Sequence, residues 1–249
     1  MSRAFDRRRF AEAYDQYVVK GRFQEVPEYY PRYISRYREN VEVFAGEVAE
    51  GPLKVLEVGG GQHALLAKVL YNDEATVADI PGPHFDYLGE QGVRTASWNL
   101  CTDEQPFEGE FDFIFFSEVI EHLPIPGHIP LERLRKALKP GGTLLCTTPN
   151  LYRLRNVVYL LLGKQIFDYF RYPTDKGLGH ILEYTAEHLR WQLETAGFDV
   201  SRVVKTHFHH SPTNPLFRVL AWVGAPLYWI PRYRDNLIAV ARRADAPEA

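Results

Sequence analysis

The chain has 249 residues, enough for one large domain or for one domain with a cap. Its 45% of hydrophobic residues can form a full core, and its net charge of −3 does not favour nucleic acid, so we expect no DNA partner. Cys101 and Cys146 form neither a metal-binding nor a disulfide pattern. Because the sequence has no secretory leader and no apolar run of membrane-spanning length, it predicts a cytoplasmic protein.

The first 50 residues are rich in Tyr and Arg and predict helices. Gly51-Pro52 then breaks the chain before the first strand. We therefore expect an N-terminal helical cap over residues 1–50 and a main domain over residues 51–249. The tyrosines of the cap either cover the core from an amphipathic helix or stack on a sugar or ring.

Apolar strand-like segments alternate with helical ones from residue 53 to residue 148. This alternation predicts a parallel sheet with helices on both faces. The predicted strands are 53–58, 75–79, 93–97, 111–116 and 142–148, and the predicted helices are 62–71, 83–91 and 128–138.

Beyond residue 150, two segments interrupt this alternation, at 151–182 and 206–233. Both are apolar and carry basic or aromatic residues, and we expect them to form a lid over the sheet and, together with the N-terminal helices, to determine the acceptor specificity. The alternative is a surface that touches a membrane, or a greasy channel for the acceptor. A helix at 185–197 and strands at 198–205 and 236–241 complete the predicted elements.

The first strand runs directly into the glycine turn Gly59-Gly60-Gly61, and an apolar helix follows. Such a turn lets a ligand approach the main chain closely. Glu57 at the strand tip would repel a phosphate and favours a ligand with cationic groups and hydroxyls. Asp79 ends the second strand about 20 residues later, the spacing expected for a carboxylate that binds ribose hydroxyls. By itself this pattern also fits a nicotinamide enzyme.

Further motifs distinguish between these alternatives. Together with the glycine turn they resemble the class I S-adenosylmethionine-dependent methyltransferases. The resemblance implies a Rossmann-like fold with a mostly parallel seven-stranded sheet, helices on both faces and an antiparallel last strand. At the position of the usual third glycine this chain has His63. The other segments that carry the resemblance are Phe111 to Leu123, Leu138 to Leu145, His180 to Thr185 and Ala196-Gly197-Phe198.

The resemblance also implies which residues bind the cofactor, and it places them at the ends of the strands. It assigns Glu57, Gly59 and Gly61 to the methionine part, Asp79 to the ribose, Ile80 to the adenine face, Asn99 and Leu100 to the adenine edge, and Ser117 and Glu118 to the reactive centre. Asp is commoner than Asn at the position of Asn99.

Glu118, Glu121 and His122 form an E-x-x-E-H segment. On one helical turn, these side chains could converge on a metal ion. The segment resembles that of ubiquinone-pathway O-methyltransferases and small-RNA 2′-O-methyltransferases, and His180 resembles the later histidine that completes a metal site in the latter. A carboxylate and imidazole set suits Mn²⁺, Fe²⁺ or Zn²⁺ better than Mg²⁺.

Without a metal, His122 is the first candidate for general base and His180 the second, and the resemblance implies that Glu118 faces the reacting groups. We therefore predict S-adenosylmethionine-dependent O-methylation of a small-molecule hydroxyl, on a glycan, glycolipid or secondary metabolite, with a divalent cation such as Mg²⁺ or Mn²⁺ as a candidate second cofactor. The alternatives are N- or C-methylation, methylation of an RNA 2′-hydroxyl, and a module that binds the cofactor without catalysis. The acidic balance weighs against RNA.

Overall fold

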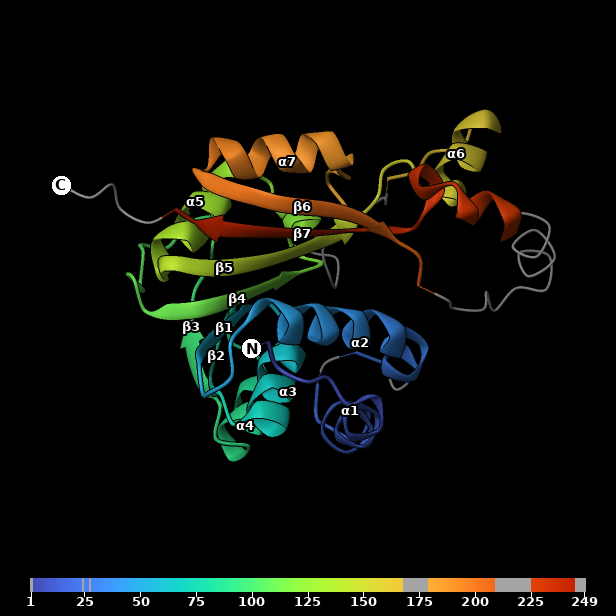
Figure 1. Ribbon diagram of the computed structural model, residues 1–249. Coiled ribbons are helices and arrows are strands. Elements are labelled where there is room, and N and C mark those ends of the chain that lie inside the picture. Colours follow the sequence, from blue (N-terminus) through green and yellow to red (C-terminus); the bar gives the residue numbers. More distant parts are fainter. Residues whose placement is uncertain (1, 24, 27, 168–178, 209–224, 245–249) are drawn as a thin grey trace.

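The computed structural model describes residues 2–23, 25–26, 28–167, 179–208 and 225–244. Its centre is a seven-stranded sheet with the order β3-β2-β1-β4-β5-β7-β6 (Figure 1). The first five strands pair in parallel, whereas β7 is antiparallel to both β5 and β6. This confirms the predicted Rossmann-like sheet. The strands are β1 (Lys54–Val58), β2 (Glu74–Asp79), β3 (Arg94–Ser97), β4 (Phe111–Ser117), β5 (Leu138–Pro149), β6 (Phe198–Thr206) and β7 (Asn236–Arg243).

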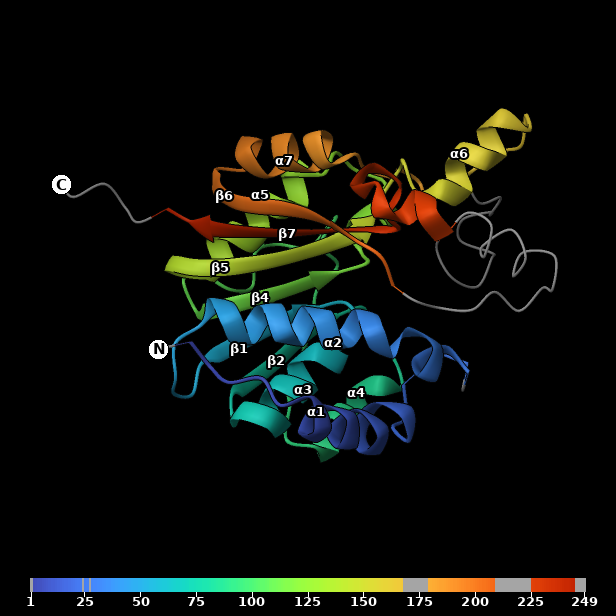
Figure 2. The ribbon, with the colours of Figure 1, turned by 45° about the vertical axis from the view of Figure 1, so that its right-hand side comes forward.

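Helices cover both faces of the sheet (Figure 2). One layer holds α2, α3 and α4, with α1 packed outside it, and the other layer holds α5 and α7. The longer helices are α1 (Arg7–Tyr14), α2 (Tyr29–Glu47), α3 (Gln62–Tyr71), α4 (His84–Glu90), α5 (His128–Ala137), α6 (Leu154–Leu161) and α7 (Ala186–Thr195). The shorter turns are the π-helix η1 (Asp15–Val19) and the 3-10 helices η2 (Ile120–His122), η3 (Ala225–Trp229) and η4 (Pro231–Tyr233).

The central strand β4 shows how the sheet is buried on both faces. Its Phe113 and Phe115 pack with Phe44 of α2, whereas Ile114 and Phe116 belong to the core cluster on the side of α5 and α7. All four side chains are completely buried, as expected for a strand inside a doubly covered parallel sheet. The parallel strands all point toward the same end of the molecule, so their carboxyl ends lie at the end where α6 is found (Figure 1).

Most of the predicted elements are confirmed to within a few residues, and β5 is the main exception. Its predicted start was residue 142, after a turn, but the strand already begins at Leu138. Leu138 pairs with Phe111, and the register then shifts before Phe113 pairs with Thr143. The Lys-Pro-Gly-Gly sequence is thus accommodated as an irregularity at the start of the strand.

The segments outside the common sheet are described only in part. Residues 168–178 of the 151–182 segment and residues 209–224 of the 206–233 segment lie outside the described residues, so the predicted lid stays a prediction. The boundary at residue 50 also stays a prediction, and α2 shares a core cluster with the sheet through Phe44. Within the described part of the chain, no helix combines the length and the apolar character needed to cross a membrane.

Candidate functional site

The glycine turn joins β1 to α3 in a conformation that requires glycine. Gly59 and Gly61 have φ values of 86° and 106°. A Cβ atom on Gly59 would lie 2.7 Å from Val119 Cγ2, and one on Gly61 would lie 2.8 Å from Leu88 Cδ1. The backbone can therefore turn here only without side chains.

Asp79 and Ile80 lie beside this turn at the end of β2. One Asp79 oxygen accepts a hydrogen bond from the Gly60 amide at 3.0 Å, and the other accepts from the Ile80 amide at 2.7 Å. The Asp79 side chain remains 29% exposed, and Ile80 presents an apolar surface that is 62% exposed. A half-exposed carboxylate next to an open apolar side chain fits a ribose and an adenine ring, so the residues present fit the nucleoside of S-adenosylmethionine.

The predicted adenine-edge and reactive-centre residues occupy the neighbouring strand ends. Asn99 Oδ1 accepts from the Cys101 amide at 3.0 Å, and Leu100 is buried in the core cluster. Ser117 ends β4, and its Oγ accepts from Asn40 Nδ2 of α2 at 3.4 Å. Their contacts with a cofactor stay predictions.

Glu57 lies beneath the turn and is almost completely buried. One of its oxygens lies 2.8 Å from His63 Nδ1, and the other accepts from the Ala64 amide at 2.8 Å. His63 is stacked between the rings of Tyr37 and Phe115, and Asn40 Nδ2 lies 3.1 Å from its Nε2. Both oxygens of Glu57 thus hold the first turn of α3, and its predicted contact with the methionine part stays a prediction.

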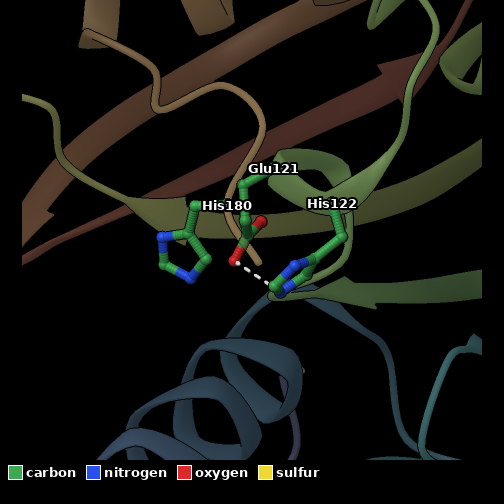
Figure 3. Close-up of side chains that lie close together, drawn as sticks. All are labelled: Glu121, His122 and His180. Atoms are coloured by element: carbon green, nitrogen blue, oxygen red, sulfur yellow. Dashed lines mark ion pairs between the residues drawn. The ribbon is translucent and has the colours of Figure 1, made fainter. Parts of the chain in front are cut away.

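Glu121, His122 and His180 converge at the same end of the sheet (Figure 3). Each offers a ligand atom, and these atoms all lie within 4.8 Å of one another. Glu121 is buried, whereas the two histidine side chains are 24% and 23% exposed. The structure therefore brings together three of the four residues predicted to bind metal.

Two backbone hydrogen bonds bring His180 to the other two residues, although it is distant in sequence. The Glu121 carbonyl accepts from the amides of Ile181 at 2.8 Å and Leu182 at 3.2 Å. The histidine at the start of this short stretch is thereby placed next to η2, and its ring lies 5.0 Å from that of His122.

Each histidine of the cluster is oriented through its Nδ1 atom. His122 Nδ1 donates to the Gly179 carbonyl at 3.2 Å, and His180 Nδ1 donates to Glu183 Oε1 at 3.0 Å. His122 Nε2 then faces Glu121 Oε1 at 3.8 Å, and the Nε2 side of His180 also points toward Glu121 (Figure 3). Supporting hydrogen bonds of this kind fix the tautomer in metal-binding histidines.

Glu183 is a supporting residue that the sequence analysis did not identify. Its buried carboxylate also binds Arg153 and accepts from Asn156 Nδ2 at 2.5 Å. Burial alone would raise the pKa of Glu183, but the hydrogen bond from His180 and the charge of Arg153 outweigh it and lower that pKa below its ordinary value. The carboxyl therefore stays ionised, as a hydrogen-bond acceptor for an imidazole must. The spacing of three between His180 and Glu183 was the signal available in the sequence.

Glu118 lies outside this cluster, which corrects the expectation of one continuous helical turn. The residue has a φ of 57°, in the left-handed region, and η2 begins only at Ile120. Its carboxylate accepts from Thr147 Oγ1 and Asn236 Nδ2, each at 2.8 Å, and pairs with Arg36 at 3.3 Å.

Arg36 of α2 is the second residue that the sequence analysis missed at this site. It is buried, its guanidinium lies over the rings of Tyr29, Tyr33 and Tyr37, and it donates to the Tyr29 hydroxyl at 2.6 Å. These tyrosines thus belong to the cluster that α2 forms with α1 and α3. The Tyr- and Arg-rich composition of α2 was visible in the sequence. Glu118, the partner of Arg36, comes from the end of a distant strand.

Glu121 is the least satisfied group of the cluster. Its Oε2 accepts from Thr148 Oγ1 at 3.0 Å, whereas its buried Oε1 has no hydrogen-bond partner within the described part of the chain. Burial raises the pKa of Glu121 well above its ordinary value, and the neighbouring Glu118 charge raises it further. A buried carboxylate with an open oxygen, beside two oriented imidazoles, fits a divalent cation.

A further histidine–carboxylate pair lies at the end of β6. His207 Nδ1 binds the Asp235 carboxylate, and the His207 ring stacks on Tyr228 at 3.9 Å. Alternate residues of a strand share a face, so the sequence also predicts that His209 points the same way as His207, but His209 lies outside the described residues.

Comparisons with known proteins identify the family and the fold of this chain. A family described as "methyltransferase domain" matches residues 28–203, more than half of the chain. No curated protein matches the chain in sequence. A structure of a S-adenosylmethionine-dependent methyltransferase from Archaeoglobus fulgidus is 18% identical with a TM-score of 0.56, and the match covers 84% of this chain and 91% of that chain.

Two further structures are similar. A S-adenosylmethionine-dependent methyltransferase from Mesorhizobium loti is 15% identical with a TM-score of 0.56, and the match covers 81% of this chain and 96% of that chain. The phosphoethanolamine N-methyltransferase 2 of Haemonchus contortus, solved with S-adenosyl-L-methionine, is 15% identical with a TM-score of 0.55, and the match covers 83% of this chain and 52% of that chain. At these identities the likeness shows a shared fold.

Proposed function

This chain belongs to the class I S-adenosylmethionine-dependent methyltransferases, and from that membership we propose that it methylates a hydroxyl of a small-molecule acceptor with the help of a divalent cation. The protein is thus an enzyme with S-adenosylmethionine as its cofactor, and this family membership favours methyl transfer over the nicotinamide and binding-only alternatives. The observation that carries the proposal is the convergence of Glu121, His122 and His180 at the carboxyl end of the sheet.

In the proposed reaction, the cofactor end of the site only binds and orients. The glycine turn would receive the methionine part, Asp79 would hold the ribose hydroxyls, and Ile80 would pack on adenine. Ser117, Asn99 and Leu100 would complete the cofactor site at the neighbouring strand ends. Alignment of donor and acceptor supplies much of the rate in a direct transfer of this kind.

The acceptor end would hold the cation through Glu121, His122 and His180. A bound cation would lower the pKa of an acceptor hydroxyl and favour the oxygen nucleophile. Nitrogen ligands favour Mn²⁺ over Mg²⁺. Glu118 would act through the charge that it places next to Glu121, with Arg36 and Asn236 holding it in position.

A reaction without metal is the second candidate for the same residues. His122 would then take the acceptor proton, since imidazole is the usual general base near neutral pH, and His180 would be the alternative base. Because His122 Nδ1 donates to the Gly179 carbonyl, Nε2 would be the nitrogen that takes the proton.

Two kinds of acceptor compete within this proposal. We favour a glycan, glycolipid or secondary metabolite that offers a hydroxyl beside a second oxygen, because two neighbouring oxygens suit a cation site. N-methylation is the alternative, supported by the name of the Haemonchus contortus neighbour. C-methylation and an RNA 2′-hydroxyl are further alternatives, and the net charge of −3 weighs against RNA.

The test combines metal binding with an acceptor screen. The full chain is stripped with a chelator and titrated with Mn²⁺, Mg²⁺ and S-adenosylhomocysteine by calorimetry. It is then assayed on vicinal diols, catechols and matched amines. We expect uptake of Mn²⁺ and of S-adenosylhomocysteine, and turnover on oxygen acceptors that is restored by Mn²⁺.

The outcomes separate the parts of the proposal. Full activity after exhaustive chelation would reject the cation and leave His122 as the base. Turnover confined to the amines would reject O-methylation while leaving the cofactor assignment intact.

A further inference from the structure

Helix α6 has an inverted distribution of polar and apolar residues. Its fully buried residue is the polar Asn156, whereas Val158, Leu160 and Leu161 are 38%, 59% and 82% exposed. Leu162, directly after the helix, is 65% exposed. A surface helix of a globular domain normally turns its apolar side chains toward the core, so α6 presents an apolar face outward.

The η3–η4 segment also exposes apolar side chains. Leu227, Trp229 and Ile230 are 42%, 83% and 46% exposed. The segment is fastened near the start of α6, because Asn150 Nδ2 donates to the carbonyls of Arg232 at 2.9 Å and Arg234 at 2.7 Å. In both ribbon views η3 lies beside α6, beyond the carboxyl ends of the parallel strands (Figures 1 and 2). We use the term outer patch for the exposed apolar residues of α6 and η3–η4 and the cations among them.

The two stretches that carry the outer patch have charged residues of one sign. Residues 151–167 and 225–234 contain five Arg or Lys and no Asp or Glu, although the whole chain has a net charge of −3. Arg155, Lys164 and Arg232 are exposed. Their cationic groups lie 5.5, 5.9 and 5.8 Å from tyrosine ring centroids, so they stay beside the apolar side chains. Exposed Leu and Trp flanked by Arg and Lys are the composition of a surface that lies on an anionic bilayer.

The outer patch is directly connected to the catalytic end of the molecule. Arg153, the N-cap of α6, pairs with Glu183, and the buried Asn156 donates to the same carboxylate at 2.5 Å. Glu183 in turn orients His180. A surface that seats α6 would therefore lie next to the Glu121–His122–His180 cluster.

We propose that the outer patch binds the surface of an anionic lipid bilayer and so places the active-site end of this methyltransferase against the membrane. Hydrocarbon contacts would come from Leu161, Leu162 and Trp229, and headgroup contacts from Arg155, Lys164 and Arg232. Delivery of an acceptor from the membrane rests on the proposed function, whereas binding to the bilayer does not.

The experiment uses the full chain and vesicles of phosphatidylcholine with or without phosphatidylglycerol, at low salt. We expect co-sedimentation with the anionic vesicles, weak or no binding to pure phosphatidylcholine, and release as salt shortens the screening length. The double variant Leu161→Ser, Trp229→Ser should lower the partition coefficient at least about tenfold. Arg155→Gln with Lys164→Gln should lower it about fivefold for each cation removed.

The matched control is Trp191→Ser, which removes a tryptophan that is 55% exposed on α7, away from the outer patch. It should bind vesicles like the wild type, and S-adenosylhomocysteine binding should be the same in all variants and report correct folding. The proposal is overturned if the wild type does not bind anionic vesicles or if the Leu161/Trp229 variant binds as well as the wild type. It is also overturned if these two substitutions abolish a dimer of the wild type, because a second copy would then cover the patch.

Discussion

The His63–Glu57 and His180–Glu183 pairs both lie at the carboxyl end of the sheet, and they differ in what surrounds the imidazole. His63 and Glu57 are both buried, and the His63 ring is stacked between two aromatic rings. Asn40 occupies its second nitrogen. His180 and Glu183 form a similar hydrogen bond, but the His180 side chain is 23% exposed and its ring faces Glu121 and His122.

The comparison separates a pair that holds the fold from a pair that presents a ligand atom. Both nitrogens of His63 are used inside the protein, so its pair fastens α2 to the cofactor turn. For His180, the carboxylate accepts from Nδ1, and the ring faces Glu121 and His122 in the cluster (Figure 3). A sequence motif does not distinguish these two situations, but variants do.

The largest expected effect is on the rate of methyl transfer, in a variant of the Glu121–His122–His180 cluster. His122→Ala removes either a metal ligand or the general base, and we expect the rate of methyl transfer to fall about 100- to 10,000-fold. S-adenosylhomocysteine binding should be unchanged in calorimetry. His188→Ala on α7 is the control and should keep the wild-type rate. A wild-type rate in His122→Ala would contradict the assignment of this cluster as the catalytic end.

His63→Ala should lower the stability of the fold, because the His63–Glu57 pair is structural. It leaves the buried Glu57 without its imidazole partner, and removal of one partner from a buried pair costs about 3–5 kcal/mol. We expect that loss in the free energy of unfolding measured in urea. His180→Ala should cost clearly less, because Glu183 keeps Arg153 and Asn156. Equal losses in the two variants would mean that both pairs are structural.

Glu183→Gln tests the role of the carboxylate that orients His180, because it removes the negative charge of Glu183 and keeps the His180 side chain. Loss of such a supporting carboxylate typically lowers metal affinity about 10- to 100-fold, and we expect this effect on Mn²⁺ binding in calorimetry. The variant Glu187→Gln, at an exposed position on α7, is the matched control. An unchanged Mn²⁺ affinity in Glu183→Gln would show that Glu183 only anchors α6.

The smallest expected effect is a gain in stability. Burial raises the pKa of Glu121 above its unfolded value of about 4.3. The free energy of unfolding therefore has the full contribution of the protonated Glu121 carboxyl below pH about 4.3. This contribution is lost as the pH rises through the folded pKa, because the buried carboxyl must then ionise. With chelator present, Glu121→Gln should thus be more stable than the wild type at neutral pH by about 1–2 kcal/mol.

This gain should shrink in acid, and Mn²⁺ should raise the melting temperature of the wild type but not of the variant. A gain that is independent of pH would contradict the assigned cause.

The sequence predicted the sheet well because the parallel strands are apolar runs separated by clear turn residues. The start of β5 was wrong, since Lys-Pro-Gly-Gly has the composition of a turn and only the pairing of Leu138 with Phe111 includes it in the strand. Glu121, His122 and His180 were accessible through their motifs. The sequence did not show that Glu118 lies outside this cluster. Its position depends on one left-handed backbone conformation and on Arg36 from another layer.

The position of β7 has a consequence for how the protein is made. Although it follows β6 in sequence, β7 lies between β5 and β6 in the sheet, and it is the strand that joins them within the described part of the chain. During synthesis, β6 therefore has to wait for later residues before it can join the sheet. Asn236 of β7 also supplies a hydrogen bond to Glu118. The end of the sheet that holds Glu118 would thus be assembled after the glycine turn, late in the emergence of the chain from the ribosome.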